Sequence, residues 1–158
     1  MGQGLLHLDL CLLESNMEIQ YVPKQKVLQK GMRLIQKSKR SLYLTMIMKL
    51  ELRTTRKEYV DLIKRKISQG IVIKRIGFCT KREYEEAKKQ MDLVFSPRNF
   101  QFKYFTKGRV QRMLIADKKE MLFAICSKRE RHVFFTKDAL IIKSFLKLFD
   151  SIYSRAII

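Results

Sequence analysis

The stretch "VQRMLIADKKEMLFAI", residues 110–125, decides how the rest of the sequence is interpreted. An apolar run ends at Ala116 and Asp117, a polar segment "KKE" follows, and the sequence becomes apolar again at Met121. Two apolar runs joined by a short polar turn indicate a β-hairpin between buried strands. The pattern leaves two roles open for Asp117 and the basic residues around it: part of a functional site, or a polar turn.

The segments around this hairpin alternate between two periodicities. Apolar residues at helical spacing predict helices over residues 24–38, 56–70, 81–95 and 138–157. Runs of β-forming residues predict strands over 41–50, 71–79, 99–105 and 132–136. This order predicts an α/β fold with a mixed, mostly parallel sheet and helices on both faces. The C-terminal helix has a broad apolar face and is expected to pack on the sheet.

A length of 158 residues predicts a single domain over residues 1–158. Residues 1–20 are expected to form an N-terminal strand or arm, although "LLHLDLCLL" also fits a helix. No stretch is long enough to span a membrane, and the apolar start lacks the basic segment of a secretory signal. We therefore predict a cytoplasmic protein.

The charge balance is the most unusual property of the composition. The sequence has 34 Lys and Arg against 15 Asp and Glu, a formal net charge of +19 and a pI near 10.1. Such a surface attracts polyanions by releasing their counterions, so nucleic acid is the first partner to consider. An anionic membrane surface is the second, and a solvated basic surface without a specific partner is the alternative.

The cysteines and histidines do not suggest a metal or a cofactor. Cys11, Cys79 and Cys126 are far apart, and neither His7 nor His132 has a cysteine at metal-ligand spacing. We expect buried thiols, no metal and no cofactor. His132 opens an apolar strand and is expected to have a structural role. The glycines never form a phosphate-binding loop, and no Gly-x-Ser-x-Gly elbow occurs.

Basic residues recur in short clusters, any of which is compatible with an ordinary solvated surface. The aromatic strand "NFQFKYF" fits either a half-buried core strand or a platform for single-stranded nucleic acid. The candidates for nucleic-acid contact are the clusters on the second helix and after the hairpin: Lys64, Arg65, Lys66, Lys128, Arg129 and Arg131.

Three features together resemble the phospholipase D-like domain, in the version found as the C-terminal regulatory domain of TrmB-type archaeal transcription regulators. A helix leads into a strand in "LIQKSKRSLYLTM", and a second helix ends in glycine before a strand in "LIKRKISQGIVIKRI". The chain then closes with the hairpin "FTKGRVQRMLIADKKEMLFAI" and the helix "ALIIKSFLKLFDSIYSRA". The resemblance covers roughly residues 20–156 and rests on patterns rather than on an invariant signature.

Catalytic members of that superfamily carry a His-x-Lys-x-x-x-x-Asp motif in which the histidine is the nucleophile. Counted back from Asp117, the histidine position is Val110 and the lysine position is Arg112. Valine cannot form a covalent phosphohistidine, so the resemblance implies a chain that is not an enzyme. Arg109, Arg112 and Asp117 are the candidates for ligand or anion binding. Arg112 is expected to bind a phosphate-like group or to form a polar pair with Asp117.

The leading hypothesis is therefore a non-catalytic effector-binding or dimerisation module in transcriptional regulation. By the resemblance it forms a homodimer, takes a small anionic or sugar effector, and works with a DNA-binding partner protein. The second hypothesis is a basic protein that binds DNA or RNA directly. The third is a phosphodiesterase or nuclease that uses other residues.

Overall fold

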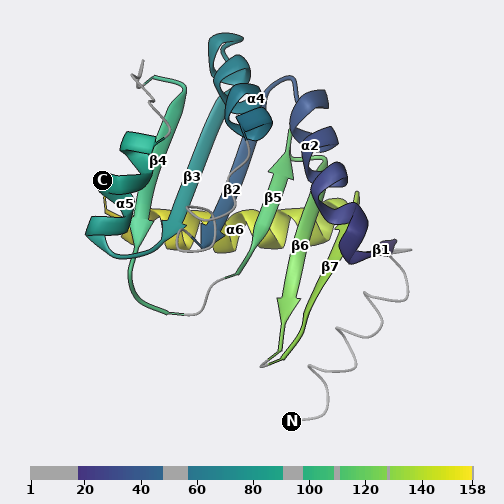
Figure 1. The fold of residues 1–158 in the computed structure, drawn as a ribbon. Helices are drawn as coiled ribbons and strands as arrows, with labels where there is room; N and C mark the ends of the chain where they lie inside the picture. The colour runs from purple at the N-terminus through teal and green to yellow at the C-terminus, as the bar shows by residue number, and fades with distance from the viewer. Residues whose placement is uncertain (1–17, 48–56, 91–97, 109–110, 128, 158) are drawn as a thin grey trace.

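The computed structural model describes residues 18–47, 57–90, 98–108, 111–127 and 129–157. Seven strands form one sheet in the order β1-β7-β6-β5-β2-β3-β4, with helices on both faces (Figure 1). The strands are β1 (Ile19–Val22), β2 (Ser41–Ile47), β3 (Val72–Phe78), β4 (Phe100–Phe105), β5 (Met113–Ala116), β6 (Glu120–Cys126) and β7 (Arg131–Thr136). The helices are η1 (Lys24–Lys26), α2 (Val27–Lys37), α4 (Lys57–Ser68), α5 (Lys81–Gln90) and α6 (Ala139–Arg155).

The mixed α/β fold is confirmed, but the sheet is less parallel than predicted. Among the described strands, β2–β3 and β3–β4 pair in parallel. The neighbours β1–β7, β7–β6, β6–β5 and β5–β2 are antiparallel. The difference follows from the connections: parallel neighbours need a crossover helix, whereas the short turns after β5 and β6 produce hairpins.

Three helices cover one face of the sheet. Apolar residues of α2, α4 and α5, among them Leu34, Ile63 and Tyr84, pack on Leu42 and Ile73 of the sheet. We call this cluster the three-helix core. Phe100, Phe102 and Tyr104 of β4 are buried in it. The aromatic strand is therefore a core strand and not an exposed stacking platform.

Helix α6 covers the opposite face, running across the strands behind the sheet in Figure 1. Asp138 caps its first turn, where the carboxylate Oδ1 accepts the N–H of Ile141 at 3.0 Å. Ile142, Phe149 and Ile152 of the helix are buried with Ile76 and Ile115 of the sheet in a second cluster, the α6 core. Packing of the C-terminal helix on the sheet is thus confirmed.

Strand β1 completes the sheet at the β7 edge and was not predicted at this position. It is only four residues long, and three of them are exposed. The predicted strand or helix over residues 5–13 lies outside the described residues. In the described part of the chain, no helix is both long and apolar enough to cross a membrane.

Candidate functional site

Strand β5 places the two motif-like residues at its opposite ends. Arg112 precedes the strand, beside the end of the antiparallel neighbour β2, and Asp117 follows it at the start of β2. The five residue steps from Arg112 to Asp117 span about 16 Å, which exceeds the combined reach of an arginine and an aspartate side chain. The predicted Arg112–Asp117 polar pair is therefore not formed, and the two residues do not share a site.

The Asp117 carboxylate binds the main chain between α2 and β2. Its Oδ1 accepts the N–H groups of Arg40 at 2.7 Å and Ser41 at 3.0 Å, and its Oδ2 accepts the N–H of Lys39 at 2.9 Å. The N–H of Asp117 itself donates to the Ser41 carbonyl at 2.8 Å. These hydrogen bonds require a tight turn, in which Asp117 and Lys118 have φ values of 54° and 57°.

The electrostatics of Asp117 agree with this structural role. Burial acts to raise the pKa of the carboxyl, but the N–H donors of Ser41, Lys39 and Arg40 and the charge of Arg40 outweigh it. The pKa is consequently lowered from its ordinary value. The carboxylate is itself the anion held by these three donors, so it serves the fold rather than an external ligand.

A neutral network fixes the other end of β5. The Thr45 hydroxyl donates to the Gln111 carbonyl at 2.6 Å and accepts the N–H of Met113 at 2.9 Å. The Gln111 amide donates to the Ala124 carbonyl at 2.9 Å. The Arg112 carbonyl accepts the N–H of Ala124 of β6 at 3.0 Å, while the residue is half-buried. Arg109 and Val110 lie outside the described residues, so their ligand and nucleophile positions remain predictions from the sequence.

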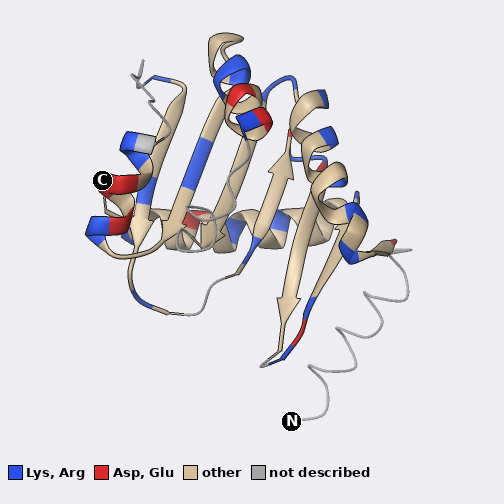
Figure 2. Ribbon diagram, viewed as in Figure 1, with Lys and Arg blue, Asp and Glu red and all other residues tan. Residues whose placement is uncertain are grey.

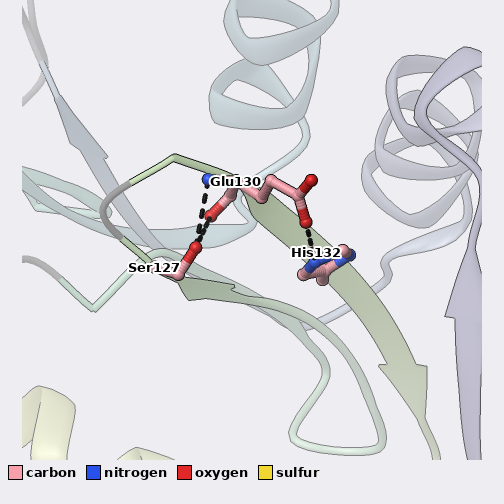
Figure 3. Close-up of polar contacts among 3 residues, drawn as sticks. All are labelled: Ser127, Glu130 and His132. Atoms are coloured by element: carbon pink, nitrogen blue, oxygen red, sulfur yellow. Dashed lines mark hydrogen bonds and ion pairs between the residues drawn. The ribbon is translucent and has the colours of Figure 1, made fainter.

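His132 lies at this same edge of the sheet, in the β6–β7 hairpin (Figure 3). Its Nε2 is 3.0 Å from Oε2 of Glu130; the Glu130 side chain is exposed and His132 is half-buried. The nearby Ser127 hydroxyl bonds the Glu130 main chain, donating to its carbonyl at 3.3 Å and accepting its N–H at 3.1 Å. Ser127 is thus engaged by the turn rather than by His132, so the three residues do not form a nucleophile–base–acid relay.

His132 and Arg112 face opposite sides of the sheet. Phe134, two residues beyond His132, packs on the α6 core, and Leu114, two residues beyond Arg112, packs on the three-helix core. Alternate residues of a strand share a face. Consequently His132 does not lie on the same face of the sheet as Arg112 and does not form a site with it.

One buried charged residue, Arg75, was not singled out from the sequence. Arg75 is 2% exposed, donates from Nε to the Met46 sulfur at 2.7 Å, and has its guanidinium 5.2 Å from the Phe102 ring centre. Strand alternation with Ile73 would have predicted this inward position.

Burial, with a contribution from Glu83, raises the pKa of Cys79 to about 11, which makes its thiol a poor nucleophile. Cys126 is exposed, contrary to the expectation of buried thiols.

The predicted nucleic-acid contacts do not form one surface. Lys64 and Arg65 lie on α4, whereas Arg129 and Arg131 lie at the β6–β7 hairpin, and Lys128 is outside the described residues. Lys66 is only 6% exposed. Its ammonium donates to the carbonyls of Gln36 at 2.6 Å and Ser38 at 2.9 Å. Lys66 therefore stabilises the C-terminal end of α2 rather than contacting an outside partner.

The most uniform basic segment is α2, which the sequence reasoning did not select. No Asp or Glu occurs between Glu18 and Glu51. In Figure 2, α2 shows Lys and Arg but no acidic residue, whereas α4 and α5 show both. The absence of Asp and Glu over this stretch would have identified α2 from the sequence. A count of Lys and Arg alone does not show which of them have acidic residues nearby.

A hollow lies where the C-terminal ends of α2 and α4 meet. Its volume is about 650 Å³. The residues that line it are mainly basic or amide side chains: Gln36, Lys37, Ser38, Lys39, Lys66, Gln69 and Ile71. Donors predominate in this lining, so the hollow suits an anionic or hydroxyl-rich group.

No protein-family model matches the sequence, and no curated protein matches it. Similar solved structures include TrmBL2, an archaeal chromatin protein with a novel mode of DNA binding, at 18% identity and a TM-score of 0.68. The match covers 98% of this chain but 60% of TrmBL2, so this chain corresponds to only part of that protein's length.

Two further solved structures are similar over almost their whole length. NucT from Helicobacter pylori has 12% identity and a TM-score of 0.64, covering 90% of this chain and 98% of NucT. Nuc from Salmonella typhimurium, a phospholipase D family member, has 11% identity and a TM-score of 0.64, covering 89% of this chain and 95% of Nuc. Identities this low establish the fold and not the activity. The chain therefore has a phospholipase D-like fold that resembles the TrmB-type domain.

Proposed function

We propose that this chain is a non-catalytic phospholipase D-like domain that binds nucleic acid in the cytoplasm. The observation that carries the proposal is the net charge of +19, with a helix-forming segment that contains no acidic residue. A surface of this kind gains affinity for a polyanion from counterion release without needing a specific pocket.

The absence of catalysis is part of the same proposal. The residue at the nucleophile position is Val110, which cannot attack phosphorus or carry a proton. The described imidazole, that of His132, lies on the face of the sheet opposite to Arg112. Arg112 retains a charge that suits a phosphate group, so binding without cleavage is the chemistry that these side chains support.

The similarity to TrmBL2 supports the proposal by analogy. TrmBL2 is a chromatin protein that binds DNA, and its fold matches nearly all of this chain. The part of TrmBL2 beyond the match has no counterpart in these residues. The proposal for this chain accordingly rests on its own charge and not on the similarity.

A salt titration tests the proposal directly. Binding of a fluorescent random duplex is measured by anisotropy between about 50 mM and about 200 mM salt. We expect the logarithm of the association constant to fall linearly with the logarithm of the salt concentration. The duplex should remain intact both with a chelator and with added divalent ions. No binding at the lowest salt concentration would refute the nucleic-acid function, and cleavage would refute the non-catalytic part.

The hollow beside α2 favours a second candidate function, that of an effector-binding module in transcriptional regulation. Its volume of about 650 Å³ and its basic and amide lining suit a small anionic or sugar effector. Thermal-shift measurements with phosphate, sugars and nucleotides test this candidate, which requires stabilisation by at least one of them. Light scattering tests the homodimer that accompanies it, for which we expect twice the mass of 18.9 kDa.

A further inference from the structure

A row of basic residues begins at the last residue of η1 and runs along one side of α2. Lys26, Lys30, Arg33 and Lys37 follow one another at intervals of four, three and four residues. Residues three or four apart are neighbours on one side of a helix. Lys26, Arg33 and Lys37 are exposed, and Lys30 is half-buried, with its ammonium 3.8 Å from the Phe135 ring centre. We call these four residues the α2 stripe.

The described carboxylates do not neutralise the α2 stripe. In the described ranges the ion pairs are His132–Glu130 and Lys137–Glu120, and neither includes a cation of α2. Like charges four residues apart, as in Arg33 and Lys37, destabilise an isolated helix. The stripe therefore has an electrostatic cost that an external polyanion would remove.

On the α6 side of the sheet three lysines lie near aromatic rings, as Lys30 of the stripe lies near Phe135. The ammonium groups of Lys74 and Lys103 lie 5.2 Å and 4.1 Å from the ring centre of Tyr153. Lys118 lies 5.8 Å from the ring centre of Tyr43. On that side, aromatic faces partly satisfy the positive charge.

The hollow between α2 and α4 continues the stripe at its C-terminal end. Lys37 belongs both to the stripe and to the lining of the hollow, and Lys39 adds a second exposed ammonium there. The buried Lys66 ammonium lies beneath the hollow, where it holds two carbonyls rather than contacting a partner, and adds only its positive charge. A phosphate that reached the end of the stripe would thus meet a concave, donor-rich surface.

We propose that the phosphate backbone of a nucleic acid lies along the α2 stripe and ends with a phosphate in the adjoining hollow. This inference rests on the proposed nucleic-acid function and adds the surface that performs it. Helix α2 is 11 residues long, or about 16 Å, which matches the axial length of about five phosphates on one strand. The stripe is therefore long enough for each of its cations to meet a separate phosphate.

The composition of this face favours nucleic acid over an anionic membrane. A helix that lies in a membrane surface buries a row of large apolar residues in the lipid. The exposed residues of α2 between its cations include Gln29 and Gln36. Among the large apolar residues of α2, Leu28 is the exposed one, at 47%. Polar amides beside cations suit contacts to phosphates and sugars.

A pair of matched double variants tests the assignment. Arg33→Gln with Lys37→Gln removes two charges from the stripe, and Lys143→Gln with Lys147→Gln removes two exposed charges, also four residues apart, from α6. We expect the stripe variant to bind the random duplex at least about tenfold more weakly and to reduce the salt slope by about 1.8. The α6 variant should bind like the unmodified chain. Circular dichroism of both variants checks that they are folded.

The outcomes separate this inference from the proposed function. If the unmodified chain binds the duplex and both variants lose affinity equally, the stripe is not the binding surface, although the nucleic-acid function stands. If the unmodified chain does not bind, the proposed function fails first. If the stripe variant keeps its affinity for the duplex but loses binding to vesicles with anionic lipids, the stripe is a membrane surface and the inference is overturned.

A third variant examines the hollow. Lys39→Gln leaves the α2 stripe intact and removes one ammonium from the lining. Relative to the unmodified chain, we expect the slope of the log association constant against log salt concentration to fall in magnitude by about 0.9. We also expect weaker competition by inorganic phosphate. If the salt dependence and the phosphate competition are both unchanged, the nucleic-acid backbone does not extend beyond Lys37. That result would refute the role of the hollow.

Discussion

The two ends of strand β5 are both tied to β2 by a side chain, but by different chemistry. At one end, the Asp117 carboxylate accepts three main-chain N–H groups and is partly open to solvent. At the other end, the buried Thr45 hydroxyl bridges the Gln111 carbonyl and the Met113 N–H. One tie depends on a charge, and the other is neutral.

This difference shows what each half of the motif-like sequence contributes. Asp117 is used by the fold, since its carboxylate holds the connection between α2 and β2. The Arg112 end has its main chain fixed by neutral bonds, so its side chain charge is not required for the tie. The fold alone therefore gives a reason for an aspartate at position 117, whatever the activity of the chain.

The largest expected effect is that of Asp117→Ala. The change removes the acceptor of three N–H groups and puts alanine at a φ of 54°, which strains an L-residue with a Cβ. We expect the free energy of unfolding, measured with urea, to fall by about 2–4 kcal/mol. Asp117→Asn tolerates this φ and keeps one acceptor, so it should lose about half as much. Equal stability of the alanine variant would show that the charged tie is dispensable.

Thr45→Val tests the neutral tie. Valine has nearly the same shape but leaves the Gln111 carbonyl and the Met113 N–H without this partner. We expect a loss of about 1–3 kcal/mol in the free energy of unfolding. Thr45→Ser, which keeps the hydroxyl, is the control and should be closer to the unmodified chain. If serine and valine destabilise equally, packing rather than hydrogen bonding holds this end.

Acid should weaken only the charged tie. The pKa of Asp117 is lowered in the folded chain, so its contribution is present above the unfolded value near 3.8 and is lost as the pH falls through the folded pKa. Urea unfolding from about pH 6 to about pH 2 should show the stability gap between the unmodified chain and Asp117→Asn closing below about pH 4. The gap for Thr45→Val should stay constant. A constant gap for both variants would mean that the carboxylate charge adds nothing.

The smallest effect is expected for His132→Asn at the β6–β7 hairpin. The His132–Glu130 pair is exposed, and exposed pairs contribute little. We expect the unfolding free energy to change by less than about 0.5 kcal/mol, with unchanged binding to a duplex. A loss above about 1 kcal/mol would show that this edge also depends on a charged tie.

The sequence was informative where one local pattern determines the structure. The hairpin, the helices and the buried strands follow from apolar spacing, and Gly70, with a φ of 78°, ends α4 as its position suggested. The Asp117 turn was correctly located, but its partners at residues 39–41 are more than 70 positions away and no local pattern encodes them.

The errors have the same origin. Arg112 and Asp117 are close in sequence, but an extended strand separates them by its full length. Lys66 looked like a surface cation because its carbonyl partners belong to another helix. The basic stripe of α2 was missed because its cations were counted in clusters along the sequence rather than around the helix.

The position of β1 has a consequence for the order in which the chain folds. Ile19 pairs with Thr136, and the Thr136 hydroxyl donates to the Glu18 carbonyl, a separation of 118 residues. During synthesis, β1 cannot form its hydrogen bonds until β7 has been made. Strand β2 can pair with β3 much earlier. Contacts this distant in sequence slow folding because a long loop must close first. We therefore expect the β7–β1 edge to form last, on a sheet that is otherwise complete.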